Sequence, residues 1–306
     1  MKMTNKNISF YDLQTSGVID KLKNGKTIED VLKFVQRKSD CVAKYEVPDG
    51  KTCFVKDVYT KTGISSIASS RLYEKAGILT PPVHLVTKKD SYTIQTIQPN
   101  VEDIDGVKTI LANSDLEYKK IQTMAFGKYK WQIFYDEDLI ATLLEFMTPS
   151  CLTSFQNMFL VDELRTDGDK HLKNYFFYKT KDSDKYEGVI GIDLDLMQIL
   201  NYCGSKKDDF TRFLFCPYQT ATPHQAYDNT CYKERITDMC QLAQDGVLST
   251  SNIDAITTAL DCDFPKEIKS ACKDSKLGFG ERNDIIKPVE RLWEYNRETI
   301  GRELGM

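Results

Sequence analysis

The spacing of apolar and polar residues divides the chain into a first part that predicts strands and a second part that predicts mainly helices. Residues 41–59 alternate apolar and polar side chains on both sides of a turn at 48–51, a pattern typical of a β-hairpin. A helix-like run at 65–77 follows, and then two further strand-like runs at 83–88 and 91–98. The order strand, strand, helix, strand, strand predicts a small antiparallel sheet with one helix.

Short motifs mark where the expected helices begin and end. Residues 27–38 open with a threonine that can cap a helix and close with two basic residues that suit the helix dipole, so we predict a helix here. In the helix at 65–77, Ser65 or Ser66 is the expected cap and Gly77 the expected stop. The sheet is therefore expected to begin after this first helix.

Beyond residue 99 the pattern changes to apolar residues at helical spacing. Helices are expected at 136–147, 150–164, 232–244, 251–260, 265–273 and 281–304, and strands at 174–179 and 188–196. The sequence therefore predicts an α+β fold of two lobes with a cleft between them. Its expected parts are an N-terminal helical extension (1–38), a sheet-rich lobe (39–99) and a helix-rich lobe (100–306).

Composition narrows the function classes. The 306 residues are 41% hydrophobic, which is enough for a substantial core. The formal net charge of −4 makes nucleic acid an improbable partner, because nucleic-acid binding needs a basic surface. One stretch, 118–131, carries four lysines among aromatic residues. It is either a solvated face or a site for a polyanion or a phosphoinositide.

Cysteine and histidine usage limits the metal chemistry and the compartment. The nine cysteines are odd in number, scattered and never spaced as C-x-x-C, which indicates free thiols in a reducing environment. With only three histidines, a zinc site is not expected, and any metal should be a hard ion with oxygen ligands. Neither a signal-peptide core nor a membrane-spanning run is present, so the expected location is the cytoplasm. Export by a specialised secretion system would leave the same pattern.

Four polar residues stand at the ends of the strand-like runs. Asp169 and Asn174 lie between a predicted helix and a predicted strand, and Asp193 ends the next apolar run. A hairpin would bring Asn174 and Asp193 to adjoining positions. Phosphoryl transfer needs a carboxylate near the acceptor hydroxyl, an amide and a second carboxylate for magnesium, and a cation for the phosphates. Lys56, on the second strand of the first hairpin, is placed to be that cation.

With these residues the chain resembles the atypical protein-kinase-like families, in particular the HipA-like kinases and the phosphatidylinositol 3/4-kinases. Their loop D-x-H-x-x-N, followed by a strand and an "ID" motif, is matched by "GDKHLKN" and "GIDLDL". The resemblance implies a bilobal kinase-like fold with a catalytic loop at 165–174 and a metal-binding strand at 189–195. It also implies ATP with Mg²⁺ or Mn²⁺, and serine or threonine hydroxyls of proteins as acceptors.

The resemblance gives each candidate residue a role. It makes Asp169 the catalytic-loop aspartate, Asn174 and Asp193 metal ligands, and Lys56 the lysine that contacts the phosphates. Residues 95–100 would form the hinge between the lobes, with backbone groups of Ile97 and Gln98 facing adenine. Three assignments of single residues stay open. They are Lys44 in place of Lys56, Asp195 assisting or replacing Asp193, and a structural role for His171.

The chain also departs from the family pattern. No glycine-rich loop precedes Lys56, and the position expected for the helix glutamate that pairs with this lysine falls near Ser66, whereas Glu74 lies late in the helix. These departures leave room for a catalytically silent binding module or for dependence on an activator. The layout is similar to secreted effector kinases of the Legionella type, some of which use an inositol polyphosphate as activator. A phosphoinositide kinase or an AMP-transferring enzyme would carry the same motif.

Overall fold

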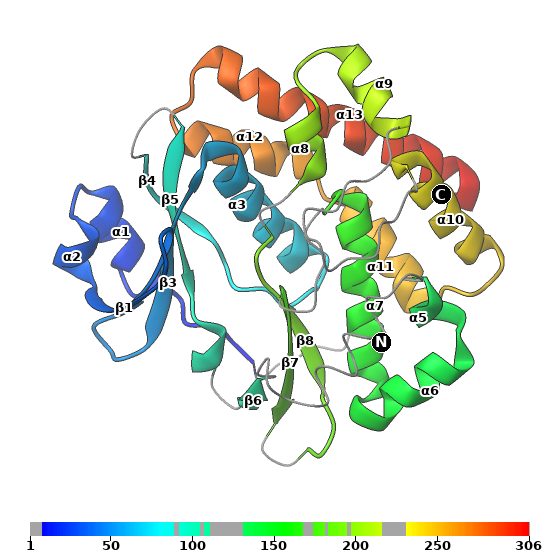
Figure 1. Ribbon diagram of the computed structural model, residues 1–306, viewed down its shortest axis with the longest axis horizontal. Helices are drawn as coiled ribbons and strands as arrows, with labels where there is room; N and C mark the ends of the chain where they lie inside the picture. Colours follow the sequence, from blue (N-terminus) through cyan, green and yellow to red (C-terminus); the bar gives the residue numbers. More distant parts are fainter. Residues whose placement is uncertain are drawn as a thin grey trace.

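The computed structural model describes residues 8–88, 92–104, 107–110, 131–167, 174–180, 183–194, 197–215 and 231–305. A five-stranded antiparallel sheet lies on one side of the molecule, and a group of helices with a second, three-stranded sheet lies on the other (Figure 1). The observed fold is α+β, as the sequence predicts. None of the helices in the described ranges combines the length and the apolar character needed to cross a membrane.

The larger sheet has the strand order β1-β2-β3-β5-β4. Its strands are β1 (Lys33–Ser39), β2 (Val42–Glu46), β3 (Thr52–Tyr59), β4 (His84–Lys88) and β5 (Thr93–Pro99). The predicted hairpin is confirmed: β2 and β3 pair without a register shift, and Gly50 takes the positive φ of 83° that the turn between them requires. The two later strands also lie where the sequence places them.

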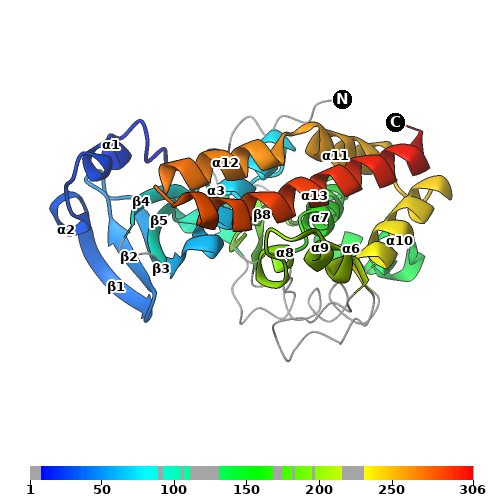
Figure 2. The ribbon, with the colours of Figure 1, turned by 90° about the horizontal axis from the view of Figure 1, so that it is seen from above.

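The prediction of a helix over 27–38 is wrong for most of its length. Thr27 does cap a helix, with Asp30 completing the capping box, but this helix, α2 (Ile28–Val31), has only four residues. Residues Lys33–Ser39 continue instead as the edge strand β1, which is exposed along its whole length (Figure 2). An exposed edge strand needs no buried face, so its sequence carries no strong alternation to distinguish it from a helix.

The helix between the two pairs of strands, α3 (Thr60–Lys75), starts earlier than expected. Tyr59 is its N-cap residue, so Ser65 and Ser66 lie inside the helix rather than at its cap. The predicted stop is confirmed, because Gly77 has a φ of 74° just beyond the helix end. Gly63 lets α3 approach the sheet, since a Cβ atom at this position would collide with Ile94 and Val58.

The helix-rich part contains most of the remaining elements. They are the short helix η1 (Val101–Asp103), β6 (Val107–Ile110), α5 (Gln132–Tyr135), α6 (Glu137–Phe146), α7 (Pro149–Leu164), β7 (Tyr175–Thr180), β8 (Gly188–Gly191), α8 (Gln198–Tyr202), α9 (Lys207–Phe215), α10 (Tyr232–Gln244), α11 (Thr250–Asp261), α12 (Phe264–Asp274) and α13 (Phe279–Leu304). A further helix, α1 (Val18–Lys23), packs on the larger sheet. The six helices predicted beyond residue 99 are all present, most within one or two residues of the expected bounds.

Three hydrophobic clusters organise the described elements, two of them large and a small third one around Val101, Tyr178 and Ile190. One of the two large clusters lies between α1 and the larger sheet and includes Ile19, Val55 and Ile97. The other is larger and joins α3 to α7, α11, α12 and α13. Helix α3 therefore belongs by its packing to the helix-rich part of the molecule, although it follows the strands of the larger sheet in the chain.

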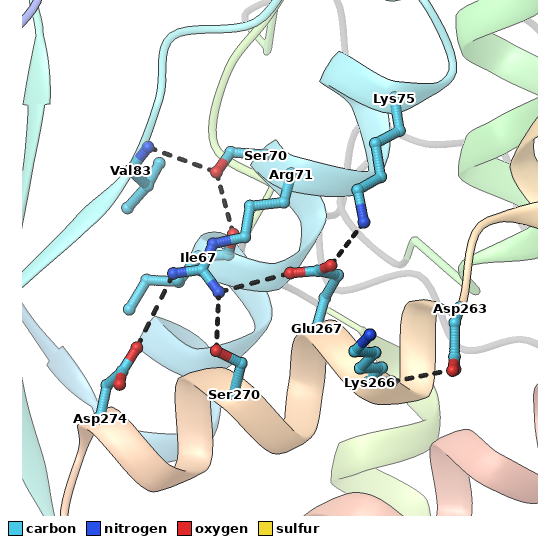
Figure 3. Close-up of polar contacts among 10 residues, drawn as sticks. All are labelled: Ile67, Ser70, Arg71, Lys75, Val83, Asp263, Lys266, Glu267, Ser270 and Asp274. Atoms are coloured by element: carbon cyan, nitrogen blue, oxygen red, sulfur yellow. Dashed lines mark hydrogen bonds and ion pairs between the residues drawn. The ribbon is translucent and has the colours of Figure 1, made fainter.

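Charged contacts reinforce the packing of α3 on α12. Glu267 of α12 accepts a hydrogen bond of 2.6 Å from Lys75 Nζ and lies 3.4 Å from Arg71 Nη1 (Figure 3). Arg71 also donates to Ser270 Oγ at 3.3 Å and lies 3.8 Å from Asp274. One side of α3 is thus held to the helix-rich part by a small ionic network.

Candidate active site

The strand β3 directs Lys56 towards the helix-rich part of the molecule. Lys56 is paired with Val42 of β2 and Thr96 of β5, so it occupies the middle of the sheet. Its Nζ is in direct contact with Oδ1 of Asp193, which follows β8. The side chain of Lys56 is only 16% exposed. Two residues that lie 137 positions apart in the chain therefore meet at one point between the two parts of the fold.

The hairpin of β7 and β8 brings Asn174 next to Asp193, as expected. Tyr175 is paired with Gly191, and the N–H group of Ile192 donates to the carbonyl oxygen of Asn174 at 2.8 Å. Asn174 is buried. Asp193 has a φ of 53°, in the left-handed region that aspartate tolerates better than most residues. The backbone of Asn174 thus adjoins the end of β8, and the Asp193 carboxylate contacts Lys56.

A cavity of about 210 Å³ opens beside the contact between Lys56 and Asp193. Its lining residues are Val42, Phe54, Lys56, Gln98, Asn100, Val101, Glu102, Phe176, Ile192 and Asp193. Apolar side chains come from both sides: Val42 and Phe54 from the larger sheet, Phe176 and Ile192 from the β7–β8 hairpin. A flat apolar ring would fit between them, with the polar groups at its edge and at one end.

The motifs do not single out these four apolar residues of the cavity, although the sequence carries one signal for them. Phe54 lies two positions before Lys56 on the same strand, and alternate residues of a strand point to the same face. The same rule would place Ile192 and Asp193 on opposite faces of a strand. Both line the cavity because β8 ends at Gly191, before these two residues.

The two predicted hinge residues are placed differently from each other. Gln98 lines the cavity with a side chain that is 8% exposed. Ile97 does not: its side chain is fully buried in the core under α1, and it is paired with Val55 on one side and His84 on the other. Because β5 is a central strand, the backbone of Ile97 is part of the sheet, and its contact with a base stays a prediction. The segment that borders the cavity starts at Gln98.

Lys44 and Glu74, the competing candidates for the lysine and for its partner, both lie away from Asp193. Lys44 lies on β2 and pairs with Glu102 at 3.5 Å, whereas Lys56 contacts Asp193. Glu74 lies near the end of α3 and lines a different hollow, next to Gly77 and the N-terminal segment. No glutamate pairs with Lys56 among the described residues. Helix α3 carries the half-buried Ser66 near the position expected for this glutamate, with the buried Ser65 and Ser69 on either side of it.

Several predicted features lie outside the described residues. They are Asp169, His171, Asp195 and nearly all of the lysine-rich stretch at 118–131. The cysteines that are described are all free, as the sequence predicts. Burial raises the pKa of the Cys53 thiol, which lies in the core under α1, to about 12, so this cysteine is inert at neutral pH.

Comparison with solved structures shows which fold this is. The chain is similar to the Helicobacter pylori proinflammatory kinase CtkA, with a TM-score of 0.60 and 14% sequence identity over 90% of this chain and 97% of that one. The chain has a protein-kinase-like fold. This agrees with the fold that the motifs imply, and at this identity the likeness shows the fold alone.

More distant similarities are also found. A Shewanella oneidensis HipA, solved with HipB and operator DNA, gives a TM-score of 0.45 at 14% identity over 100% of this chain and 74% of that one. The Golgi casein kinase gives 0.46 at 10% identity over 97% and 76%. No protein-family model and no curated protein sequence matches the chain. The named structures give no support to an origin as a Legionella-type effector.

Proposed function

We propose that this protein is an ATP-dependent phosphotransferase that transfers the γ-phosphoryl group to serine or threonine hydroxyls of proteins, its own included. The observation that carries the proposal is the direct contact between Lys56 and Asp193 across the two parts of a kinase-like fold, with Asn174 adjoining. These are the cation, the carboxylate and the amide that phosphoryl transfer requires. Lys56 and Asp193 line a cavity that also has apolar walls.

The donors fit a divalent cation of the Mg²⁺ or Mn²⁺ type. Asn174 offers an amide oxygen and Asp193 a carboxylate, and both ions prefer oxygen ligands. The buried position of Asn174 explains why an amide, rather than a second carboxylate, would be used, because a buried charge is costly. When bound, the cation would neutralise charge on the phosphates.

The protein's own residues then divide the work. Phe54 and Phe176 would hold the base between the sheet and the β7–β8 hairpin, and Lys56 would attract the phosphates. In the proposal Asp169 orients the acceptor hydroxyl, as its place in the "GDKHLKN" motif implies. The oxygen of that hydroxyl would bond to the γ-phosphorus and its proton would pass to the Asp169 carboxylate, while the bond from phosphorus to the bridging oxygen breaks and ADP leaves with that electron pair.

The proposal is tested by intact-mass spectrometry after incubation with ATP and Mg²⁺ or Mn²⁺, with a generic protein substrate present. We expect additions of one phosphate on the protein or on the substrate. Asp169→Ala and Asp193→Ala should each remove them, with a loss of rate of several decades. Asp184→Ala, in an exposed turn, is the matched control and should keep wild-type activity.

Other outcomes would redirect the proposal. An addition the size of AMP would indicate adenylyl transfer on the same fold, and phosphate on an inositol lipid but not on protein would indicate a lipid kinase. No addition, together with tight ATP binding, would leave a binding module. An inositol polyphosphate added to the same assay tests the activator that the resemblance to effector kinases implies.

A further inference from the structure

Arg165 is the fully buried C-cap residue of α7 and the first residue of the predicted catalytic loop. Its Nη2 donates to Asp167 Oδ2 at 2.5 Å and lies 3.6 Å from Asp162 Oδ1, so its charge is balanced. Its Nη1 donates to two further groups, the carbonyl oxygen of Leu194 at 3.0 Å and Ser69 Oγ of α3 at 3.3 Å. One guanidinium group thus connects α7, α3 and the residue that follows Asp193.

The Leu194 carbonyl is held from two directions. Besides Arg165, Ser65 of α3 donates its hydroxyl to this oxygen at 3.4 Å. The neighbouring Thr166 fixes the chain a few residues later: its carbonyl oxygen accepts from Gln198 N–H at 2.9 Å, and its hydroxyl accepts from Ile199 N–H at 3.3 Å. Arg165 and Thr166, at the end of α7, therefore hold the chain at Leu194 and again at Gln198 and Ile199.

These contacts bear on Asp193 because its backbone is in an uncommon conformation. A residue other than glycine keeps a positive φ, here 53°, only where its surroundings fix it. Leu194 directly follows Asp193, so contacts that hold the Leu194 carbonyl oxygen restrict the backbone next to Asp193. Ser65 and Ser69 of α3 take part in these contacts. Among the described residues, no glutamate of this helix reaches Lys56.

We propose that Arg165, together with Ser65 and Ser69, is a positioning group for Asp193. It couples helix α3 to the metal-binding carboxylate through the Leu194 carbonyl, in place of a pair between a helix glutamate and Lys56. The inference rests on the proposed function, in which Asp193 binds the cation. A purely structural Arg165, which only neutralises Asp162 and Asp167, would stabilise the fold without affecting cation binding.

The test uses variants that leave no buried charge unpaired. Replacing Ser65 and Ser69 together by alanine removes the hydroxyl that binds Leu194 and the one that binds Arg165, and alanine favours the helix. Ser66→Ala, on the same helix but half-buried and outside this network, is the matched control. Arg165→Lys is the second variant, and it keeps the charge while losing the planar fork that reaches several groups.

The measurement is a titration of a fluorescent ATP analogue, in EDTA and then at increasing Mn²⁺, on folded protein checked by circular dichroism. We expect the Ser65→Ala/Ser69→Ala variant to need at least about fivefold more Mn²⁺ for half of the metal-dependent gain in affinity. Its affinity in EDTA, which the cavity sets, should equal that of the wild type. Arg165→Lys should show a larger shift in the same direction, and Ser66→Ala none.

Two results would be negative, and they are distinguishable. If folded Ser65→Ala/Ser69→Ala and Arg165→Lys both respond to Mn²⁺ as the wild type does, while Asp193→Ala loses the response, the positioning role is wrong and the proposed function stands. If Asp193→Ala also keeps the wild-type response, Asp193 is not the cation ligand. The proposed function then fails, and the positioning role fails with it.

Discussion

At the scale of single residues, Gln98 is the candidate for a side-chain contact to a bound base. It is nine-tenths buried and lines the cavity. A ligand in the cavity can supply a donor and an acceptor to an amide there, and each such hydrogen bond adds modestly to the affinity. The amide of glutamine matches the amino group and the adjacent ring nitrogen of adenine.

We therefore expect Gln98→Leu to weaken ATP binding by roughly tenfold, the equivalent of about 1.4 kcal/mol and within the usual range for such contacts. It should also reduce the preference for ATP over GTP. Equilibrium titrations with ATP and with GTP measure both the affinity for ATP and the preference for ATP over GTP. Gln95→Leu is the control, because Gln95 lies on the same strand but donates to Asp57 at 2.8 Å and does not line the cavity. Unchanged selectivity in Gln98→Leu would assign base recognition to the backbone instead.

Part of this site is predictable from the sequence for a physical reason. Motif spacing points to Lys56, Asn174 and Asp193, because short-range order in a hairpin fixes which strand ends adjoin, and the structure brings these three together. It does not point to Arg165, whose partners are 29 and 96 positions away in the chain. A buried hydrogen-bond network of this kind depends on how distant parts of the chain pack, and neither periodicity nor local motifs record that. The role of Asp169 stays a prediction.

At the scale of elements, the contact between α3 and α12 predicts a stability that depends on pH. Burial opposes ionisation of Glu267, but the hydrogen bond from Lys75 and the charges of Lys75 and Arg71 outweigh it and lower the pKa of Glu267 below its ordinary 4.5. A lowered folded-state pKa stabilises the fold above the unfolded-state value, and this stabilisation is lost as pH falls through the folded-state pKa. Figure 3 shows the carboxylate between the two cations.

Glu267→Gln should therefore lower the free energy of unfolding by about 1 kcal/mol at neutral pH, in keeping with partly exposed ion pairs. The difference from the wild type should shrink as the pH falls below 4.5 and vanish once the folded-state carboxyl is protonated. Urea unfolding at several pH values measures this, with Glu294→Gln on an exposed face of α13 as the control. A difference that stays constant with pH would mean that the carboxylate contributes packing rather than charge.

The elements themselves are predictable where one face is buried and the pattern is repeated. Helices α10 to α13 carry apolar residues at helical spacing over three turns or more, and their bounds follow from the sequence. Strand β1 escapes prediction because all its residues are exposed, Phe34 included at 53%. Its conformation comes from pairing with β2, not from its own composition.

At the scale of the whole molecule, the division into separate hydrophobic clusters predicts how a nucleotide would change the dynamics. The larger sheet has its own core with α1, whereas α3 shares the core of α7 and α11 to α13. In the view of Figure 2, α3 lies against α12, away from the edge strand β1. The cavity is lined by the sheet on one side and by the β7–β8 hairpin on the other. On the hairpin side, Phe176 and Ile192 pack against a small cluster of their own around Val101 and Ile190. A nucleotide in the cavity would therefore contact the larger sheet and this hairpin together.

Hydrogen exchange measured by mass spectrometry should show this coupling. With ATP and Mn²⁺, we expect slower exchange in β2 and β3 and, at the same time, in β7 and β8, because a ligand that contacts both sides stabilises both. Peptides from α3 should already exchange slowly without nucleotide and change little, because α12 and Arg165 hold this helix. Lys56→Met should remove the protection on both sides together, since Lys56 of the sheet contacts Asp193 directly and would attract the phosphates. Protection confined to the sheet would place the nucleotide outside the cavity, and strong new protection of α3 would mean that this helix is free to move before binding.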